Sequence, residues 1–351
     1  MRFDHRSLGQ RVRFGSGQAR ENLAAEVELT GSTRAMVIAA RDEQELAESV
    51  TAGLPVAGVH DEVVMHVPAN VARRARQVAA ERDIDLLISI GGGSTTGLAK
   101  AVALTSGIAI VAVPTTYAGS EATNVWGMTE SSKKTTGVDD RVLPRTVIYD
   151  AELTLSLPVD LSVASALNAL AHCVDSLWAP RADPINGALA AEGIRALNLG
   201  LPAVHDDPAG IEGREQTLYG AYLSAVAFAS AGSGLHHKIC HVLGGMFDLP
   251  HAQTHAVVLP YVLAFNAPAA PSAAARIAAA LGSTDAISGL AALRDRVGAP
   301  RALRDLGMQE DGIDAAARAV VESAPADNPN PVTIGNIAAL LRAAWEGSEA
   351  R

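Results

Sequence analysis

Short apolar runs rich in Val and Ile alternate with Ala-rich stretches through the first 150 residues of the chain. Each run is followed by a turn and then by apolar positions at a helical spacing, an order typical of a parallel sheet with helices between its strands. The pattern predicts an α/β domain with a Rossmann-like parallel sheet. Its clearest strands are 35–39, 86–90, 108–113 and 146–149, and its clearest helices are 69–82 and 97–104.

Strand signals stop after residue 149, and the apolar positions then follow a helical period to Trp345. The segment that runs to Pro158 is the expected connection between the two patterns. We therefore predict a nucleotide-binding α/β domain over 1–157 and an all-helical domain over 158–351. The clearest helices of the second domain are 168–178, 184–199, 214–230 and 236–244.

The composition narrows the class of partner. The 351 residues carry a formal net charge of −10, which disfavours nucleic acids and anionic membranes, so we expect a small-molecule partner. No run approaches the ~18 apolar residues of a membrane span, and the first residues are polar, so we expect a cytoplasmic protein. Its two cysteines, Cys173 and Cys240, are too few for a disulfide framework.

A glycine-rich loop, Gly91-Gly92-Gly93-Ser94, separates the strongest predicted strand from a predicted helix. Backbone amides in such a loop can approach phosphate oxygens closely, and the helix dipole favours their negative charge. The spacing is not G-x-G-x-x-G, and a tight connection alone would need similar residues. The loop therefore predicts an anion site only in combination with its neighbour.

That neighbour is 114–123, a loop crowded with hydroxyl and small side chains after the next predicted strand. Nucleotides bind at adjacent carboxyl ends of parallel strands, so the two loops together predict a nicotinamide cofactor. No acidic residue stands at 39–41 to bind an adenosine 2′-hydroxyl, which leaves NADH and NADPH both open. The predicted cofactor contacts are Gly92, Gly93, Ser94, Thr95, Thr115, Thr116, Tyr117, Ser120 and Thr123.

Histidines are concentrated in the second half of the chain. His172 lies four residues after Asn168, and His241 lies four after His237, so each pair shares one face of its helix. A single histidine is usually an ordinary core or surface residue, but this density predicts one site made of His172, His237, His241 and His251. We interpret as ordinary residues His5, His60, His66, His205 and His236.

These segments together resemble the iron-containing (group III) alcohol dehydrogenase family. The resemblance rests on the G-G-G-S loop, on Pro114 to Glu121, and on the helix from His237 to His241 followed by Pro250-His251. It implies a dehydroquinate synthase-like fold, in which a nucleotide-binding α/β domain precedes a helical domain. It also implies that Lys134 contacts the cofactor and that the protein forms a homodimer.

In metal-dependent members of that family, an Asp and three His bind a divalent ion. The corresponding positions here are Asn168, His172, His237 and His251. An amide oxygen lacks the negative charge of a carboxylate, so we expect no tightly bound metal. With asparagine at this position, the chain resembles one branch of the family, the maleylacetate reductases. Members of this branch reduce the carbon–carbon double bond of maleylacetate to give 3-oxoadipate.

The resemblance to this branch implies a small dicarboxylate substrate. Hydride addition to its double bond develops charge on a ketone oxygen, which the four histidines of the predicted site could stabilise before one of them protonates the enolate carbon. The predicted substrate contacts are Asn168, His172, His237, His241 and Lys238. Two alternatives remain open: a metal-dependent dehydrogenase of a small alcohol or aldehyde, and a nucleotide-binding protein without catalysis.

Overall fold

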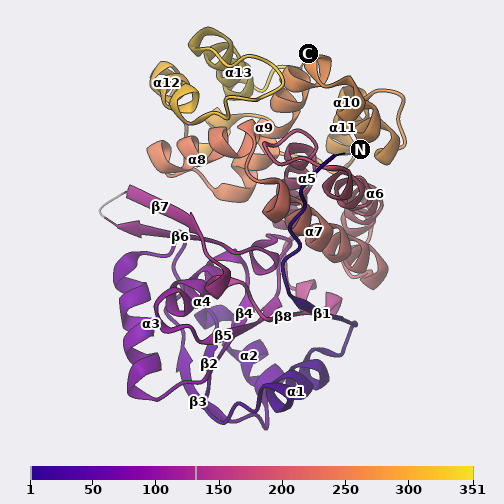
Figure 1. The fold of residues 1–351 in the computed structure, drawn as a ribbon. Coiled ribbons are helices and arrows are strands. Elements are labelled where there is room, and N and C mark those ends of the chain that lie inside the picture. Colours follow the sequence, from indigo (N-terminus) through magenta and orange to yellow (C-terminus); the bar gives the residue numbers. More distant parts are fainter. Residues whose placement is uncertain (1, 131–132, 351) are drawn as a thin grey trace. The chain divides into compact units, whose positions relative to one another are not determined.

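The computed structural model describes residues 2–130 and 133–350, apart from the side chains of 133 and 134. The chain divides into two compact units (Figure 1), one formed by Leu8–Leu157 and the other by the helical part that begins at Pro158. The segment that ends at Ser7 groups with the helical unit, whereas we predicted the first domain over 1–157. His5 connects this segment to the helical unit, because Nδ1 of His5 lies 2.8 Å from Oδ2 of Asp183.

The first unit is built on a six-stranded, fully parallel sheet with the strand order β1-β8-β5-β4-β2-β3 (Figure 1). The parallel arrangement confirms the predicted fold class. Its strands are β1 (Arg11–Phe14), β2 (Ala35–Ile38), β3 (Val56–His60), β4 (Leu86–Gly91), β5 (Ala109–Pro114) and β8 (Thr146–Tyr149).

Helices cover both faces of this sheet. Along β2, Met36 and Ile38 pack on one face with α3 and α4, whereas Val37 packs on the other with α1 and α2. Because both faces are buried, the inner strands β2, β4, β5 and β8 are mainly apolar rather than alternating. The covering helices are α1 (Ala19–Thr30), α2 (Gln44–Thr51), α3 (Ala69–Glu81) and α4 (Gly93–Ser106).

Our sequence interpretation did not include four strands. One is the edge strand β1, whose arginines alternate with apolar residues, and Arg13 donates from Nε to the buried carboxylate of Glu26 at 2.5 Å. Another is β3, which is short and only partly buried. The remaining two form an antiparallel hairpin, β6 (Val125–Glu130) and β7 (Lys133–Val138), which is rich in polar residues.

The second unit is helical, with no strand among its described residues. One apolar core joins α8, α9, α12 and α13. Within the described part of the chain, no helix has the length and apolar character needed to cross a bilayer. The helices are α5 (Val159–Ser176), α6 (Pro184–Asp206), α7 (Ile211–Ala231), α8 (Leu235–Phe247), α9 (His251–Asn266), α10 (Pro271–Ala280), α11 (Ala286–Arg296), α12 (Ile313–Ser323) and α13 (Ile334–Glu346).

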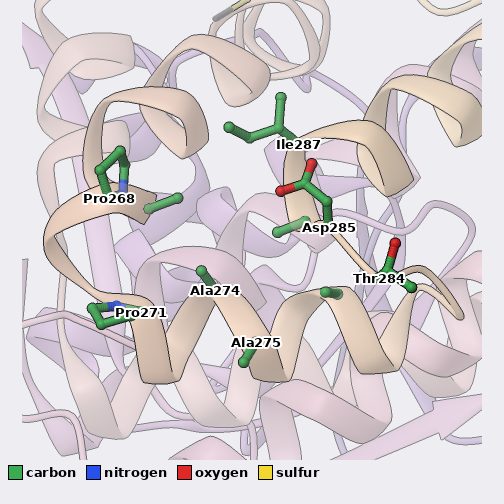
Figure 2. Close-up of a pocket in the computed structure, with 10 residues that line it drawn as sticks. Pro268, Pro271, Ala274, Ala275, Thr284, Asp285 and Ile287 are labelled. Carbon is green, nitrogen blue, oxygen red and sulfur yellow. The ribbon is translucent and has the colours of Figure 1, made fainter.

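A pocket of about 360 Å³ lies beside α10 and the start of α11, and its lining is mainly alanine and proline (Figure 2). The carboxylate of Asp285 in this lining is already used, because it accepts the backbone N–H of Ser288 at 2.7 Å and caps α11. None of the predicted site residues lines this pocket. The pocket is therefore not part of the predicted site.

Candidate active site

The glycine loop leads into helix α4, and its backbone is suited to binding an anion. Gly92 is the N-cap of α4 and provides no side-chain cap, so the first amides of the helix remain directed at the loop. Gly91 has a φ of +143°, and a Cβ there would collide with the carboxylate of Glu43 and the hydroxyl of Thr95. Both the backbone conformation and the lack of space require glycine at this position. These features fit the pyrophosphate of a dinucleotide.

The loop after β5 packs directly on the glycine loop. A Cβ on Gly92 would lie 3.0 Å from Cγ2 of Thr116, and one on Gly93 would lie 3.2 Å from Cβ of Ala118. The backbone N–H of Thr115 donates to the carbonyl of Gly91 at 3.3 Å. The two loops that we predicted to form one nucleotide site therefore lie side by side, with Ser94 and Ser120 partly exposed.

Three side chains predicted as cofactor contacts already have partners within the unit. Thr115 Oγ1 donates to Glu43 Oε1 at 2.8 Å, and Thr123 Oγ1 donates to the carbonyl of Ser120 at 3.2 Å. Tyr117 is fully buried, with its hydroxyl 3.4 Å from Oγ1 of Thr154. These hydrogen bonds help to hold the loop, and contact of the three residues with the cofactor stays a prediction.

A buried lysine that we did not predict fastens the second loop. Lys100 of α4 donates from Nζ to the carbonyls of Ser120, Thr123 and Val125 at 2.6, 2.8 and 2.8 Å. Burial lowers the pKa of this ammonium group to about 7. In the sequence, Lys100 stands inside an otherwise apolar helical segment, and this position could have indicated that the lysine is buried. Lys134, a further predicted cofactor contact, has its side chain outside the described residues.

In the helical unit, α5, α8 and α9 bring the four predicted histidines into one cluster. The rings of His172 and His237 are stacked, with centroids 4.8 Å apart and planes 14° apart. His241 lies 6.2 Å from His237 between ring centroids, and His251 lies 4.4 Å from His255. The cluster also contains residues outside the prediction, namely Phe228 of α7, His236 and His255.

His236, which we interpreted as an ordinary core or surface residue, is fully buried next to the predicted histidines, and its Nε2 lies 2.9 Å from Nδ1 of His255. The four-residue spacing of His251 and His255 was the signal that could have placed His255 in the cluster. Lys238 of α8, a predicted substrate contact, is only partly buried, whereas its neighbours His236 and His237 are buried in the cluster.

A buried carboxylate orients the cluster. Asp175 of α5 lies with Oδ2 2.7 Å from Nδ1 of His237, and it accepts the backbone N–H groups of Gly234 and His237 at 3.1 and 3.3 Å. It therefore fixes both the start of α8 and the direction of the His237 ring. Burial raises the pKa of Asp175 to about 6, so the group is a carboxylate at neutral pH.

The buried histidines are neutral at neutral pH. Burial lowers the pKa of His172 to about 4 and that of His236 to about 3, and it holds the pKa values of His237 and His255 well below the usual range. A neutral ring that donates Nδ1–H to Asp175 presents an unprotonated Nε2. His237 Nε2 is accordingly a buried acceptor atom, without a partner among the described residues.

Two family models match the chain. One for the iron-containing alcohol dehydrogenases matches residues 9–151, and one for the C-terminal part of the Fe-containing alcohol dehydrogenase family matches residues 162–345. The chain belongs to the iron-containing alcohol dehydrogenase family. The family resemblance predicted from the motifs is confirmed.

The chain is also similar to individual members of the family over its full length. It is 47% identical to a maleylacetate reductase of Burkholderia cepacia over 339 residues, 96% of each chain. An iron-containing alcohol dehydrogenase structure from Corynebacterium glutamicum matches with a TM-score of 0.97 and 61% identity, covering 98% of this chain and 97% of that one. A maleylacetate reductase structure from Agrobacterium tumefaciens matches with a TM-score of 0.94 and 41% identity, covering 99% of both.

The metal positions of the family do not fit a metal ion in this member. Asn168 replaces the charged ligand, and its Oδ1 is buried. The lone pairs of imidazole nitrogens lie in the ring plane, and the nearly parallel planes of His172 and His237 do not meet at one ion. Among the described His, Cys and carboxylate residues, these two do not belong to a group whose ligand atoms converge.

Proposed function

We propose that the protein is an oxidoreductase that reduces the carbon–carbon double bond of maleylacetate to give 3-oxoadipate, with hydride from NADH or NADPH. The observation that supports this most strongly is the full-length similarity to maleylacetate reductases. In addition, the family's metal position has asparagine in place of the carboxylate, and the ring nitrogens of His172 and His237 do not converge on one point. The nicotinamide supplies hydride to the alkene carbon β to the ketone. The loops after β4 and β5 hold its phosphates.

The neutral histidines of the cluster stabilise the charge that develops on the ketone oxygen. A neutral imidazole donates one N–H without introducing a buried positive charge, and fixed donors require no reorganisation as the enolate forms. His172 serves in this role because its Nδ1 is buried and has no partner in the described part of the chain. Phe228 packs against both His172 and His237 and shields them from water.

Reduction is completed when a proton reaches the enolate carbon. We assign proton delivery to His241 and His251, because these two members of the cluster retain exposed surface and can be reprotonated from solvent. Asp175 holds the ring of His237 in one direction, and its unprotonated Nε2 accepts a hydrogen bond from a donor such as a water molecule, which in turn donates to the acceptor oxygens of the substrate. Asn168 contributes an amide on the same side of α5 as His172.

Loss of NADH or NADPH absorbance on addition of maleylacetate tests this function directly. We expect turnover with maleylacetate, no oxidation of small alcohols, and a rate that a chelator leaves unchanged. A chelator-sensitive rate with alcohol oxidation would instead show a metal-dependent alcohol dehydrogenase. Binding of NADH without turnover of either substrate would show a nucleotide-binding protein without catalysis.

A further inference from the structure

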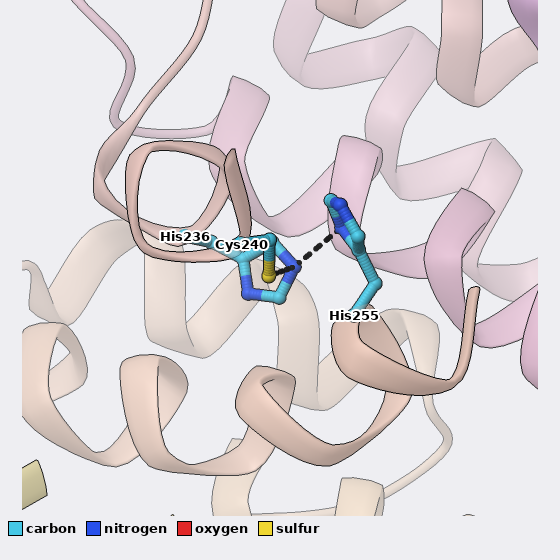
Figure 3. Close-up of side chains that lie close together, drawn as sticks. All are labelled: His236, Cys240 and His255. Atoms are coloured by element: carbon cyan, nitrogen blue, oxygen red, sulfur yellow. Dashed lines mark hydrogen bonds between the residues drawn. The ribbon is translucent and has the colours of Figure 1, made fainter. Parts of the chain in front are cut away.

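Three potential metal ligands meet inside the helical unit, next to the stacked His172–His237 pair. His236 and Cys240 lie one helical turn apart on α8, and His255 projects toward them from α9 (Figure 3). Their exposed fractions are 0%, 3% and 0%. One ligand atom of each lies within 4.8 Å of those of the other two.

The distances between these atoms are close to those around a bound ion. His236 Nε2 lies 2.9 Å from His255 Nδ1 and 3.6 Å from Cys240 Sγ. Zinc binds nitrogen at about 2.0–2.1 Å and sulfur at about 2.3 Å, so a tetrahedral ion holds neighbouring ligand atoms about 3.3–3.7 Å apart. The two distances from His236 Nε2 differ from these values by only a few tenths of an ångström, and the ligand atoms of Cys240 and His255 lie within 4.8 Å of each other.

Hydrogen bonding within the chain does not account for the cluster. When His236 and His255 share one hydrogen bond, one ring must donate and the other must accept. The outer nitrogens, His236 Nδ1 and His255 Nε2, are then both buried with no partner among the described residues. A buried polar atom without a partner destabilises the fold, so apolar side chains would stabilise this position better.

We propose that His236, Cys240 and His255 bind a divalent ion of the zinc class, at a site distinct from the family's metal positions. The ion accepts lone pairs from two imidazole nitrogens and from the thiolate of Cys240, whose proton is released to solvent, and no oxidation state changes. Two histidines and one cysteine suit a borderline-soft ion. Because the ligands come from α8 and α9, the ion fastens these helices together.

The electrostatic surroundings favour a cation. The buried Asp175 carboxylate accepts from His237, the residue next to the ligand His236. A divalent ion compensates the charge of the Cys240 thiolate and of this carboxylate.

Cobalt substitution in the full chain tests the site without measuring activity. The protein is unfolded in chelator and refolded with Zn²⁺ or Co²⁺. We expect about one ion per chain, a raised melting temperature, and a near-ultraviolet charge-transfer band from thiolate to Co²⁺. Cys240→Ser should abolish the band. The matched variant Cys173→Ser, which alters the other buried cysteine, should keep it.

His251→Ala separates this site from the family's metal positions, and the band should survive that substitution. Absence of the band from the wild-type protein would overturn the proposal, whatever the variants do. So would metal that persists in Cys240→Ser but is lost in His251→Ala, because the ion would then lie at the family's positions. Since the readouts are metal content and absorption, these outcomes are independent of the maleylacetate assay.

Discussion

Asp175→Asn is expected to lower kcat by about 100-fold or more, while the variant stays folded. One atom, Oδ2 of Asp175, accepts the backbone N–H groups of Gly234 and His237 and also the Nδ1–H of His237. An asparagine oxygen at this position keeps the cap at the start of α8 but offers the ring only a neutral acceptor. The ring of His237 then loses the charged partner that fixes its tautomer and direction, so Nε2 is no longer held as an oriented acceptor.

The pH dependence of kcat identifies this as an effect of orientation. Burial raises the pKa of Asp175 to about 6, so the carboxylate becomes protonated and loses its hold on His237 as the pH falls through 6. The wild-type rate should fall there, and the variant should lack that decline. Asp285→Asn, which alters the cap of α11 instead, should change neither quantity. Wild-type kcat and pH profile in Asp175→Asn would contradict the assignment.

The sequence could predict the sheet and the helical unit because burial imposes regular patterns on both. Parallel strands covered on both faces are continuously apolar, and this pattern located β4 and β5 and hence both loops of the nucleotide site. The edge strand β1 and the β6–β7 hairpin were missed because their side chains are partly solvated. A segment with polar residues on both faces has no regular apolar spacing, so its hydrophobic pattern cannot be distinguished from that of a loop.

The candidate site was predictable only where polar residues repeat at a helical spacing. Pairs four residues apart marked Asn168 with His172 and His237 with His241, and the pair His251 and His255 carried the same signal. No local pattern joins α8 to α9, so the contact of His255 with His236 depends on tertiary packing. Asp175 was missed for a related reason, since its partners lie about sixty residues away along the chain. Sequence spacing reports neighbours on one helix, whereas these contacts depend on how helices pack.

Lys100→Met is expected to destabilise the first unit by about 3 kcal/mol and to weaken NADH binding at least about tenfold. Lys100 is completely buried, and its ammonium group is the shared donor to three carbonyls of the second loop. Methionine fills a similar volume but donates nothing. Each carbonyl left without a donor in a buried site costs about 1–3 kcal/mol, and water that enters to replace the donor would loosen the loop.

The loss should appear in binding as well as in stability, because Lys100 links the two halves of the nucleotide site. It projects from α4, the helix that begins at the glycine loop. Its ammonium group donates to the loop after β5, which packs against Gly92 and Gly93. Fluorescence titration with NADH and urea unfolding measure the two effects. Lys238→Met, a half-buried lysine of the helical unit, is the matched control and should leave NADH affinity unchanged. Wild-type NADH affinity in Lys100→Met would contradict this role. The loop would then keep its conformation without the ammonium group, through the backbone contacts to Gly91 and Gly119 alone.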